Sequence, residues 1–243
     1  MGSLIRCCVS WAPLRREADS RSEMISALLF GEGAEVLETS GDWFFVETLF
    51  DRYRGWISKM QTETTENTSP LHIVREALHL NNGRHRFYLP AGSEIPEGTN
   101  LRIGEETYPL PDLTYTPMMS VRSQMLEEAR NWMGAPYLWG GRTIWGCDCS
   151  GFVQVLAKIH GISLPRDASQ QVSCGKEVAF EQQHPGDLAF FHNEQGAIVH
   201  VGICTGGHSI IHASGQVRED MLDERGIFHE TENRYTHRLH SIR

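Results

Sequence analysis

The sequence predicts an α+β protein that consists of two small β-barrels followed by a larger domain in which helices come before strands. Short strand patterns, separated by turn residues at spacings of about ten residues, run through residues 4–112 and are typical of small barrels. From residue 120 onward, apolar residues at helical spacing come first and strand patterns follow within one contiguous core, which is the arrangement of α+β proteins.

The first predicted barrel spans residues 1–62 and contains short segments rich in β-branched and aromatic residues. Its predicted strands are Ile5–Ser10, Ala34–Glu38, Asp42–Glu47 and Tyr53–Ile57. A turn at Ser40–Asp42 separates two of these strands. Residues 61–69 contain no apolar side chain, so we interpret them as a linker.

A second β-rich stretch lies within residues 69–115 and weakly echoes the first. Its predicted strands are Leu71–Val74, Arg86–Leu89 and Asn100–Ile103. Proline and glycine supply the turns between them, at Pro90–Gly92 and Pro96–Gly98. We therefore interpret this stretch as a second, divergent barrel.

The last predicted domain covers residues 119–243. A first helix, marked by Met125, Ala129 and Trp132, ends at Gly134–Pro136, and a second begins near Cys149 and ends at Gly161. Strand patterns then form a meander at Leu188–Phe191, Ile198–Ile203 and Ile210–Ala213.

Composition narrows the possible partners and the compartment. The chain carries a net charge of −9 and has a sequence pI of about 5.7, which argues against nucleic acid and anionic membranes as partners. No stretch approaches the ~18–20 apolar residues of a membrane span, and Met1–Ser10 lacks the pattern of a secretory signal. The six cysteines are read as reduced thiols of a cytoplasmic protein. Export stays open if Met1-Gly2 replaced a signal peptide.

Cys149 is the strongest candidate for a nucleophile. It stands at the predicted start of a helix, where the helix dipole and free backbone N–H groups favour a thiolate. A thiolate also needs a base that a third group orients, and His200 and His212 follow in strand-like contexts. The chain order is therefore Cys, His, His.

The two histidines can meet across a hairpin. If the hairpin is centred on Gly206, His200 lies directly opposite His212, where Cβ atoms are about 4.5–5.5 Å apart. A two-residue turn at Gly206-Gly207 would instead shift the pairing by one residue and aim the two side chains apart.

A metal site is the main alternative chemistry. Cys147 and Cys149 with His200 and His212 offer thiolate and imidazole ligands, but a C-x-C pair without a second paired cluster matches zinc spacing poorly. We therefore expect no metal and no cofactor. A lone cysteine or histidine is more often a structural residue than a functional one, so no single residue carries the interpretation.

Several segments, in order along the chain, resemble those of NlpC-type papain-like cell-wall cysteine peptidases. They are Tyr137–Gly141, Asp148–Phe152, Leu164–Arg166 with Gln170, Pro185–Leu188, His200–Ile203 and Ile211–Ser214. The resemblance implies that Cys149 is the nucleophile, His200 the general base and His212 the residue that orients it. It further implies that Tyr137 lies near the nucleophile and helps to stabilise the oxyanion.

The N-terminal segments resemble the first bacterial SH3-like domain of NlpC-type enzymes with two such domains. They are Arg21–Met24, Leu28–Glu32, Asp42-Trp43 and Tyr53–Trp56. Such enzymes are γ-D-glutamyl-L-diamino-acid endopeptidases that act on muropeptides with a free N-terminal L-alanine. The resemblance implies substrate-binding roles for Asp148, Ser150, Trp139, Tyr53, Glu23 and Ser169.

We therefore expect a cytoplasmic, monomeric cysteine endopeptidase of peptidoglycan recycling, whose partners are peptidoglycan-derived peptides. The alternatives are an exported hydrolase of intact peptidoglycan, a non-catalytic module that binds wall peptides, and acyl transfer to an acceptor other than water. Both meso-diaminopimelate and lysine are candidates for the diamino acid.

The first testable prediction concerns the nucleophile. Replacing Cys149 by alanine or serine should abolish peptide hydrolysis and leave the fold intact, because no other group can form the covalent intermediate. Steady-state kinetics measures the first effect and circular dichroism the second. A Cys149→Ala enzyme that keeps more than a few per cent of wild-type turnover would contradict this role. Iodoacetamide should label Cys149 ahead of Cys147.

Overall fold

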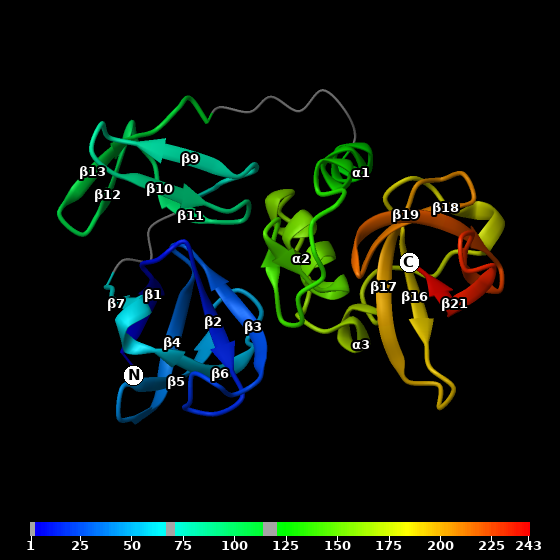
Figure 1. Ribbon diagram of the computed structural model, residues 1–243, viewed down its shortest axis with the longest axis horizontal. Helices are drawn as coiled ribbons and strands as arrows, with labels where there is room; N and C mark the ends of the chain where they lie inside the picture. Colours follow the sequence, from blue (N-terminus) through cyan, green and yellow to red (C-terminus); the bar gives the residue numbers. More distant parts are fainter. Residues whose placement is uncertain (1–2, 67–70, 114–120) are drawn as a thin grey trace. The chain divides into compact units, whose positions relative to one another are not determined.

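The computed structural model describes residues 3–66, 71–113 and 121–243. The chain divides into two compact units (Figure 1). Unit 1 contains residues 1–116 together with residues 139–144, and unit 2 contains residues 117–138 and 145–243. Among the described residues, no helix is long and apolar enough to cross a membrane.

Unit 1 begins with a seven-stranded antiparallel sheet in the order β3-β2-β6-β5-β4-β1-β7. Its strands are β1 (Leu4–Cys7), β2 (Trp11–Arg15), β3 (Met24–Leu29), β4 (Gly33–Ser40), β5 (Trp43–Thr48), β6 (Arg54–Ser58) and β7 (Thr62–Thr64), with the short 3-10 helix η1 (Lys59–Gln61) before β7. Buried and half-buried residues alternate along β1 and β2, as expected for strands with one face on a core. That core includes Ile5, Leu14, Leu28, Val46 and Ile57.

The predicted strands at residues 34–38, 42–47 and 53–57 are confirmed by β4, β5 and β6. The linker predicted from residue 61 is wrong at its start, because β7 pairs there with β1. As the last strand of the sheet order, β7 forms its ladder through the backbone and buries no side chain, so its polar sequence carried no strand signal. Residues 67–69 of that predicted linker lie outside the described residues.

Residues 71–113 form three two-stranded antiparallel sheets, in which β8 pairs with β11, β9 with β10, and β12 with β13. Their bounds are β8 (Leu71–Ile73), β9 (Leu78–Asn81), β10 (Arg86–Leu89), β11 (Glu94–Pro96), β12 (Asn100–Ile103) and β13 (Glu106–Pro109). The strands predicted at residues 86–89 and 100–103 are confirmed by β10 and β12. They enclose a core of their own, which Phe30 from the first sheet joins. The interpretation as a second SH3-like domain stays a prediction.

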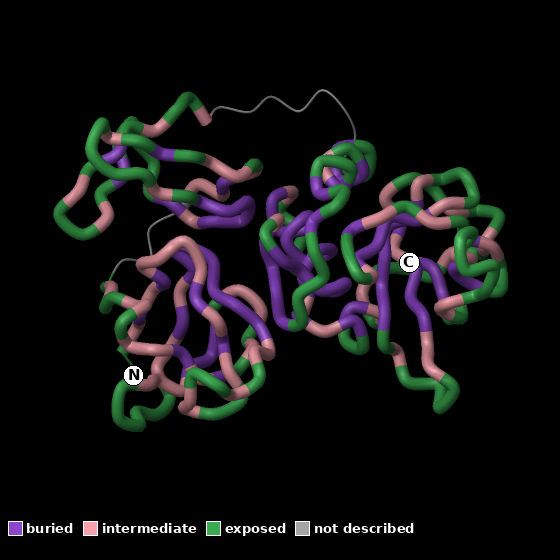
Figure 2. Tube along the Cα trace, viewed as in Figure 1, coloured by how far each residue is buried: buried purple, intermediate pink, exposed green. Residues whose placement is uncertain are grey.

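Unit 2 combines helices with a closed six-stranded barrel. Its helices are α1 (Val121–Asn131), α2 (Cys149–Ile159) and α3 (Ala168–Gln171), with the 3-10 helix η2 (Phe180–Gln182). The barrel strands are β16 (Leu188–His192), β17 (Ile198–Cys204), β18 (Ser209–Ser214), β19 (Gln216–Asp223), β20 (Gly226–His229) and β21 (Arg234–Ile242). α2 is buried along its whole length (Figure 2) and packs against β17 and β18. The predicted order of helices before strands is confirmed within this unit.

The segment of residues 139–144 belongs to unit 1, although the sequence places it within the predicted peptidase domain. The short strand β14 (Arg142–Thr143) lies in this segment, and β15 (Gly146–Cys147) follows it in unit 2. Arg142 donates to both carboxylate oxygens of Glu32, at 2.7 and 3.0 Å, and to the carbonyl oxygen of Ala27 at 2.7 Å. Arg142 and Glu32 are each 3% exposed, so this ion pair is excluded from water.

Breaking this buried pair should destabilise unit 1. Arg142→Met removes the guanidinium from a buried carboxylate, which is expected to lower the free energy of unfolding by about 3–5 kcal/mol. The double variant Arg142→Met/Glu32→Leu should recover most of that loss, because no buried charge then remains. Urea denaturation followed by circular dichroism measures both. Arg234→Met, which breaks an exposed pair with Glu232, is the control and should leave the midpoint unchanged.

Candidate active site

Cys149 is the first residue of α2, as the sequence predicts. Asp148 caps the helix: its backbone is extended, and its Oδ1 accepts a 2.7 Å hydrogen bond from the backbone N–H of Gly151. A capping carboxylate satisfies one of the free N–H groups of the first turn. The helix start is thus determined locally by an aspartate directly before the cysteine.

A buried network holds this helix start in place. Arg166 donates to Asp148 Oδ1 at 3.0 Å, to Asp148 Oδ2 at 2.5 Å and to Ser150 Oγ at 2.9 Å. Arg166 is 1% exposed and Asp148 4%. From the sequence, Asp148 and Ser150 are expected to contact substrate, whereas Arg166 is part of a family motif with no assigned role. Their substrate contacts stay predictions, and any ammonium group at Asp148 would share the carboxylate with a guanidinium.

Burial controls the protonation of Cys149. Burial, followed by the negative charge of Asp148, raises the pKa of the Cys149 thiol to about 12, and a backbone hydrogen bond from Val201 and the charge of Arg166 only partly oppose this. Burial of the helix start thus opposes the thiolate that the helix dipole and the free backbone N–H groups favour. The hydrogen bond from Val201 also places the thiol beside β17, the strand that carries His200.

The two histidines meet in neither of the two registers that the sequence left open. His212 pairs with Gly202, not with His200 as in a hairpin centred on Gly206, nor one residue away from His200 as in a two-residue turn at Gly206-Gly207. The connecting turn contains left-handed residues at Gly206 and His208, which gives the hairpin another centre. The ladder is offset by two residues, and because side chains alternate with a period of two, His200 and His212 keep the same face.

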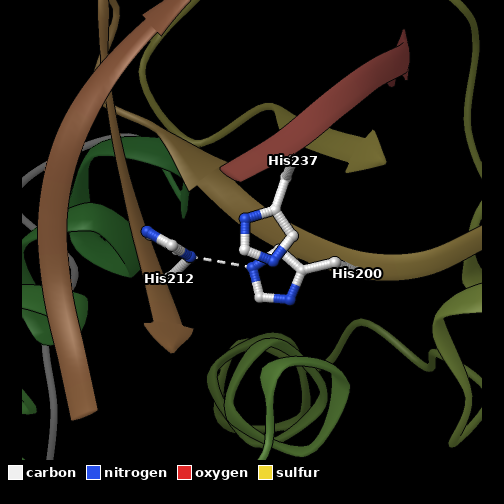
Figure 3. A group of neighbouring side chains, drawn as sticks. All are labelled: His200, His212 and His237. Carbon is white, nitrogen blue, oxygen red and sulfur yellow. Dashed lines mark hydrogen bonds between the residues drawn. The ribbon is translucent and has the colours of Figure 1, made fainter. Parts of the chain in front are cut away.

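Gly202 makes this diagonal contact possible. A Cβ atom at Gly202 would lie 2.8 Å from Cβ of His212, closer than packed side chains allow. With no side chain directly opposite, the ring of His212 reaches His200, and His200 Nε2 lies 2.8 Å from His212 Nδ1 (Figure 3). Both histidines are buried, at 4% and 1% exposure.

Asp220 extends this contact into a chain of three side chains. Its Oδ2 lies 2.9 Å from His212 Nε2, and its Oδ1 accepts a 2.7 Å hydrogen bond from Arg218. A carboxylate accepts, so His212 carries its proton on Nε2 and offers a lone pair at Nδ1. His200 Nε2 must then donate, which leaves the lone pair of its Nδ1 as the basic site. In Figure 3 this second nitrogen points away from His212, towards the helix drawn end-on.

The protonation states agree with this chain. Burial, with smaller contributions from His237 and His212, lowers the pKa of His200 well below its usual value, so His200 is neutral and can accept a proton. Burial alone would raise the pKa of Asp220, but the hydrogen bonds from His212 and Arg218 outweigh it and lower that pKa. Asp220 is therefore ionised at neutral pH.

His237 is a third histidine at this site, and no motif in the sequence predicts it. Its ring, on β21, stacks on that of His200 with centroids 4.1 Å apart and an interplanar angle of 25°. Among the described residues, His200, His212 and His237 form the group whose possible ligand atoms all lie within 4.8 Å of one another (Figure 3). The metal alternative weighed from the sequence combined Cys147 and Cys149 with His200 and His212, and neither cysteine is in this group.

Tyr137 lies near the nucleophile, as expected. Its backbone N–H donates to Gly215, and Tyr137 forms an isolated β-bridge with Cys147. Burial, with the neighbouring Cys149 and Asp148, raises the pKa of the Tyr137 phenol to about 12. The phenol is thus protonated at neutral pH and can donate a hydrogen bond. Its role at the oxyanion stays a prediction.

The remaining predicted substrate residues lie in both units. Glu23 and Trp139 are both in unit 1, where Trp139 Nε1 donates to Glu23 at 2.8 Å, and Arg16 donates to the other oxygen of Glu23 at 2.7 Å. Tyr53 packs against the core of the first sheet. Ser169 is an exposed residue of α3 in unit 2. Their contacts with substrate stay predictions.

Comparisons with known proteins identify the family to which this fold belongs. Residues 134–236 match the NlpC/P60 family, and residues 14–61 match the bacterial dipeptidyl-peptidase SH3 domain. The chain is 32% identical over 209 residues to the gamma-D-glutamyl-L-lysine dipeptidyl-peptidase of Bacillus subtilis (strain 168), which covers 76% of this chain and 71% of that protein. It is 37% identical over 97 residues to the murein DD-endopeptidase/murein LD-carboxypeptidase of Escherichia coli (strain K12), which covers 40% of this chain and 51% of that protein.

A solved structure extends the likeness over the whole fold. The crystal structure of an NlpC/P60 family protein from Bacillus cereus superposes with a TM-score of 0.82 at 21% identity, covering 99% of each chain. The fold and the relatives define the class as a cysteine peptidase with an N-terminal SH3-like β-barrel domain. The chain belongs to the NlpC/P60 family.

The hydrogen-bond chain predicts that replacing Asp220 by asparagine lowers activity more than replacing it by alanine. An asparagine can present its N–H to His212 Nε2, which moves the proton of His212 to Nδ1 and that of His200 to the nitrogen that should act as base. Asp220→Asn should therefore lower kcat/KM for peptide hydrolysis by about 10²–10⁴-fold, the range for a lost general base. Asp220→Ala imposes no tautomer and should lose less.

Steady-state kinetics of the two variants tests this order. Glu219→Gln, a neighbour on β19 that bonds Ser209, is the matched control and should retain wild-type rates. An asparagine variant that is as active as the alanine variant, or more active, would show that Asp220 does not set the tautomer.

Proposed function

We propose that this protein is a γ-D-glutamyl-L-diamino-acid endopeptidase that acts on muropeptides with a free N-terminal L-alanine, in cytoplasmic recycling of peptidoglycan. The observation that carries the proposal is the His200–His212–Asp220 chain on the strands beside a buried Cys149. The likeness over 76% of the chain to an enzyme named gamma-D-glutamyl-L-lysine dipeptidyl-peptidase supports the choice of bond.

In this mechanism, catalysis begins with proton transfer. The neutral His200 takes the proton of the Cys149 thiol as Sγ attacks the carbonyl carbon of the γ-D-glutamyl amide. The imidazolium that forms donates to His212, whose proton on the far nitrogen is held by ionised Asp220. The resting pair is thus neutral, and its charge separation develops only as the new bond forms.

The tetrahedral intermediate then breaks down. Its oxyanion needs hydrogen-bond donors, and the protonated phenol of Tyr137 is the candidate donor. The imidazolium of His200 returns its proton to the leaving amine of the diamino acid, and the C–N bond breaks to leave a thioester on Cys149. Water, deprotonated by His200, hydrolyses the thioester and restores the thiol.

Recognition of the substrate's ammonium group is assigned to acidic side chains. Glu23 and Asp148 are the candidates, and both carboxylates already bond within the chain, to Arg16 and Trp139 and to Arg166 respectively. A carboxylate whose hydrogen bonds come from fixed groups is held in position for a further cation. Intact glycan strands carry an amide in place of the ammonium and would be rejected.

A second candidate function is hydrolysis of intact peptidoglycan after export. The likeness over 40% of the chain to an Escherichia coli enzyme named murein DD-endopeptidase favours this alternative. A non-catalytic binding module is disfavoured, because Cys149, His200 and His212 are all present.

The test compares three substrates by mass spectrometry of the products: L-Ala-γ-D-Glu-meso-diaminopimelate, its N-acetyl form and intact sacculi. N-acetylation removes the positive charge and adds bulk, and it should lower kcat/KM by about 10²-fold or more, because the substrate loses its charged contact with Glu23 or Asp148. A peptide with lysine in place of meso-diaminopimelate, measured under the same conditions, determines which diamino acid the enzyme prefers.

Glu23→Gln is the matched variant for this test. It should lower kcat/KM for the free amine and leave the rate on the N-acetyl peptide unchanged, because the acetylated substrate has no charge for Glu23 to hold. Equal rates on all three substrates would contradict recycling and support the exported wall hydrolase.

A further inference from the structure

We propose that the side chains of His200, His212 and His237 form a binding site for a zinc-type divalent metal ion, and that occupancy of this site switches the peptidase off. The switch rests on the proposed function, because it acts through His200 as the base. The metal site itself does not, because it follows from the arrangement of three imidazoles.

The spacing of the ring nitrogens suits a tetrahedral ion. The three ligand atoms all lie within 4.8 Å of one another, and His200 Nε2 is 2.8 Å from His212 Nδ1. Zinc–nitrogen bonds of about 2.0–2.1 Å in tetrahedral geometry place nitrogens roughly 3.3 Å apart. Because the ring of His237 stacks on that of His200 at an interplanar angle of 25°, metal binding requires one of these rings to tilt until both lone pairs converge on the ion. In Figure 3 the ring of His237 overlies that of His200, and one of its nitrogens is drawn beside the His200–His212 contact.

In two of the three rings, the nitrogen that faces away from the cluster already has a hydrogen-bond partner. Asp220 bonds His212 Nε2 at 2.9 Å, which leaves Nδ1 facing the cluster with a lone pair. The Nδ1 of His237 lies 2.9 Å from Thr236 Oγ1, which leaves its Nε2 as the ligand. Carboxylate or hydroxyl partners on the outer nitrogen are the usual support of metal-bound histidines, because they fix tautomer and orientation.

The chemistry of the donors selects the ion. Neutral imidazole is the form in which histidine binds a metal ion. Three nitrogen ligands favour zinc and similar transition metals over magnesium and calcium, which prefer oxygen. Three protein ligands also leave a fourth position for water.

Metal binding removes the catalytic base without removing a proton from the protein. At rest His200 carries its proton on Nε2, and the lone pair of Nδ1 is the basic site. To bind the ion through Nε2, the ring must shift that proton to Nδ1. The nitrogen that should accept the thiol proton of Cys149 is then already protonated, and its lone pair is gone. The ring of His200 stays neutral, but its lone pair is now on Nε2, where it binds the ion, and no longer on Nδ1.

The experiment measures zinc binding directly, in Cys149→Ala protein that has no active-site thiol. Isothermal titration in a zinc-buffered solution should show one tight site. His237→Phe in the same background keeps a flat ring against His200 but removes the ligand, and it should weaken binding at least tenfold. His240→Phe, on the same strand and exposed, is the matched control and should bind like its parent.

A second arm measures inhibition. Active enzyme should lose hydrolysis as free zinc rises and regain it with chelator, and His237→Phe should require at least tenfold more zinc to lose half of its own uninhibited rate. His237→Gln serves as a second ligand-free variant if the phenylalanine variant does not fold. Cobalt in place of zinc should give a tetrahedral visible spectrum without a thiolate charge-transfer band.

Three outcomes would overturn the proposal. If Cys149→Ala does not bind zinc, or if the His237 variants bind zinc as tightly as their parent, then zinc does not bind at the three histidines. A site formed by a thiolate and an imidazole would be one alternative. Zinc binding without loss of activity would overturn the switch and leave the metal site standing. Because the titration needs no substrate, these results are distinct from any failure of the proposed function.

Discussion

The buried ion pair between Asp148 and Arg166 is the interaction on which the site depends. Both side chains are almost inaccessible to water, and two parallel hydrogen bonds join them. A buried charge is tolerated only with such a partner, so the pair determines where the first turn of α2 can lie. Asp148 also caps that helix, and Cys149 follows it directly. The local cap therefore determines where the helix begins, and the ion pair with Arg166 on a separate segment holds that helix start in place.

The barrel provides the second constraint, which is the alternation of side chains along its strands. His200 and His212 lie on neighbouring strands, and Asp220 lies on the next one. Each faces the same way because the offsets between strands preserve the period of two. Gly202 opens the space between the histidines. The result is a chain of groups in which ionised Asp220 determines the tautomer of both rings.

Burial has opposite consequences for the two reacting groups, and both favour a neutral resting state. It raises the pKa of the Cys149 thiol and lowers the pKa of His200. Both shifts favour charge separation during the attack on substrate over charge separation at rest. The nitrogens of His200, His212 and His237 lie within 4.8 Å of one another, so the ring that serves as the proposed base also belongs to a possible ligand set for a transition metal.

The sequence by itself determined the order of the elements, the helix start at Cys149 and the identity of the two histidines, because these depend on residues near one another in the chain. Asp148 before an apolar helical pattern is such a local signal. Only the tertiary structure decided the register of the His200–His212 hairpin, the pairing of Arg166 with Asp148 and the presence of Asp220 and His237 at the site. These features depend on strand offsets and on burial. The residues of a strand indicate which of its side chains face the core, but not how a neighbouring strand is aligned with it. A carboxylate on the strand after His212 was the available signal for Asp220, whereas His237, which joins from the last strand of a closed barrel, had none.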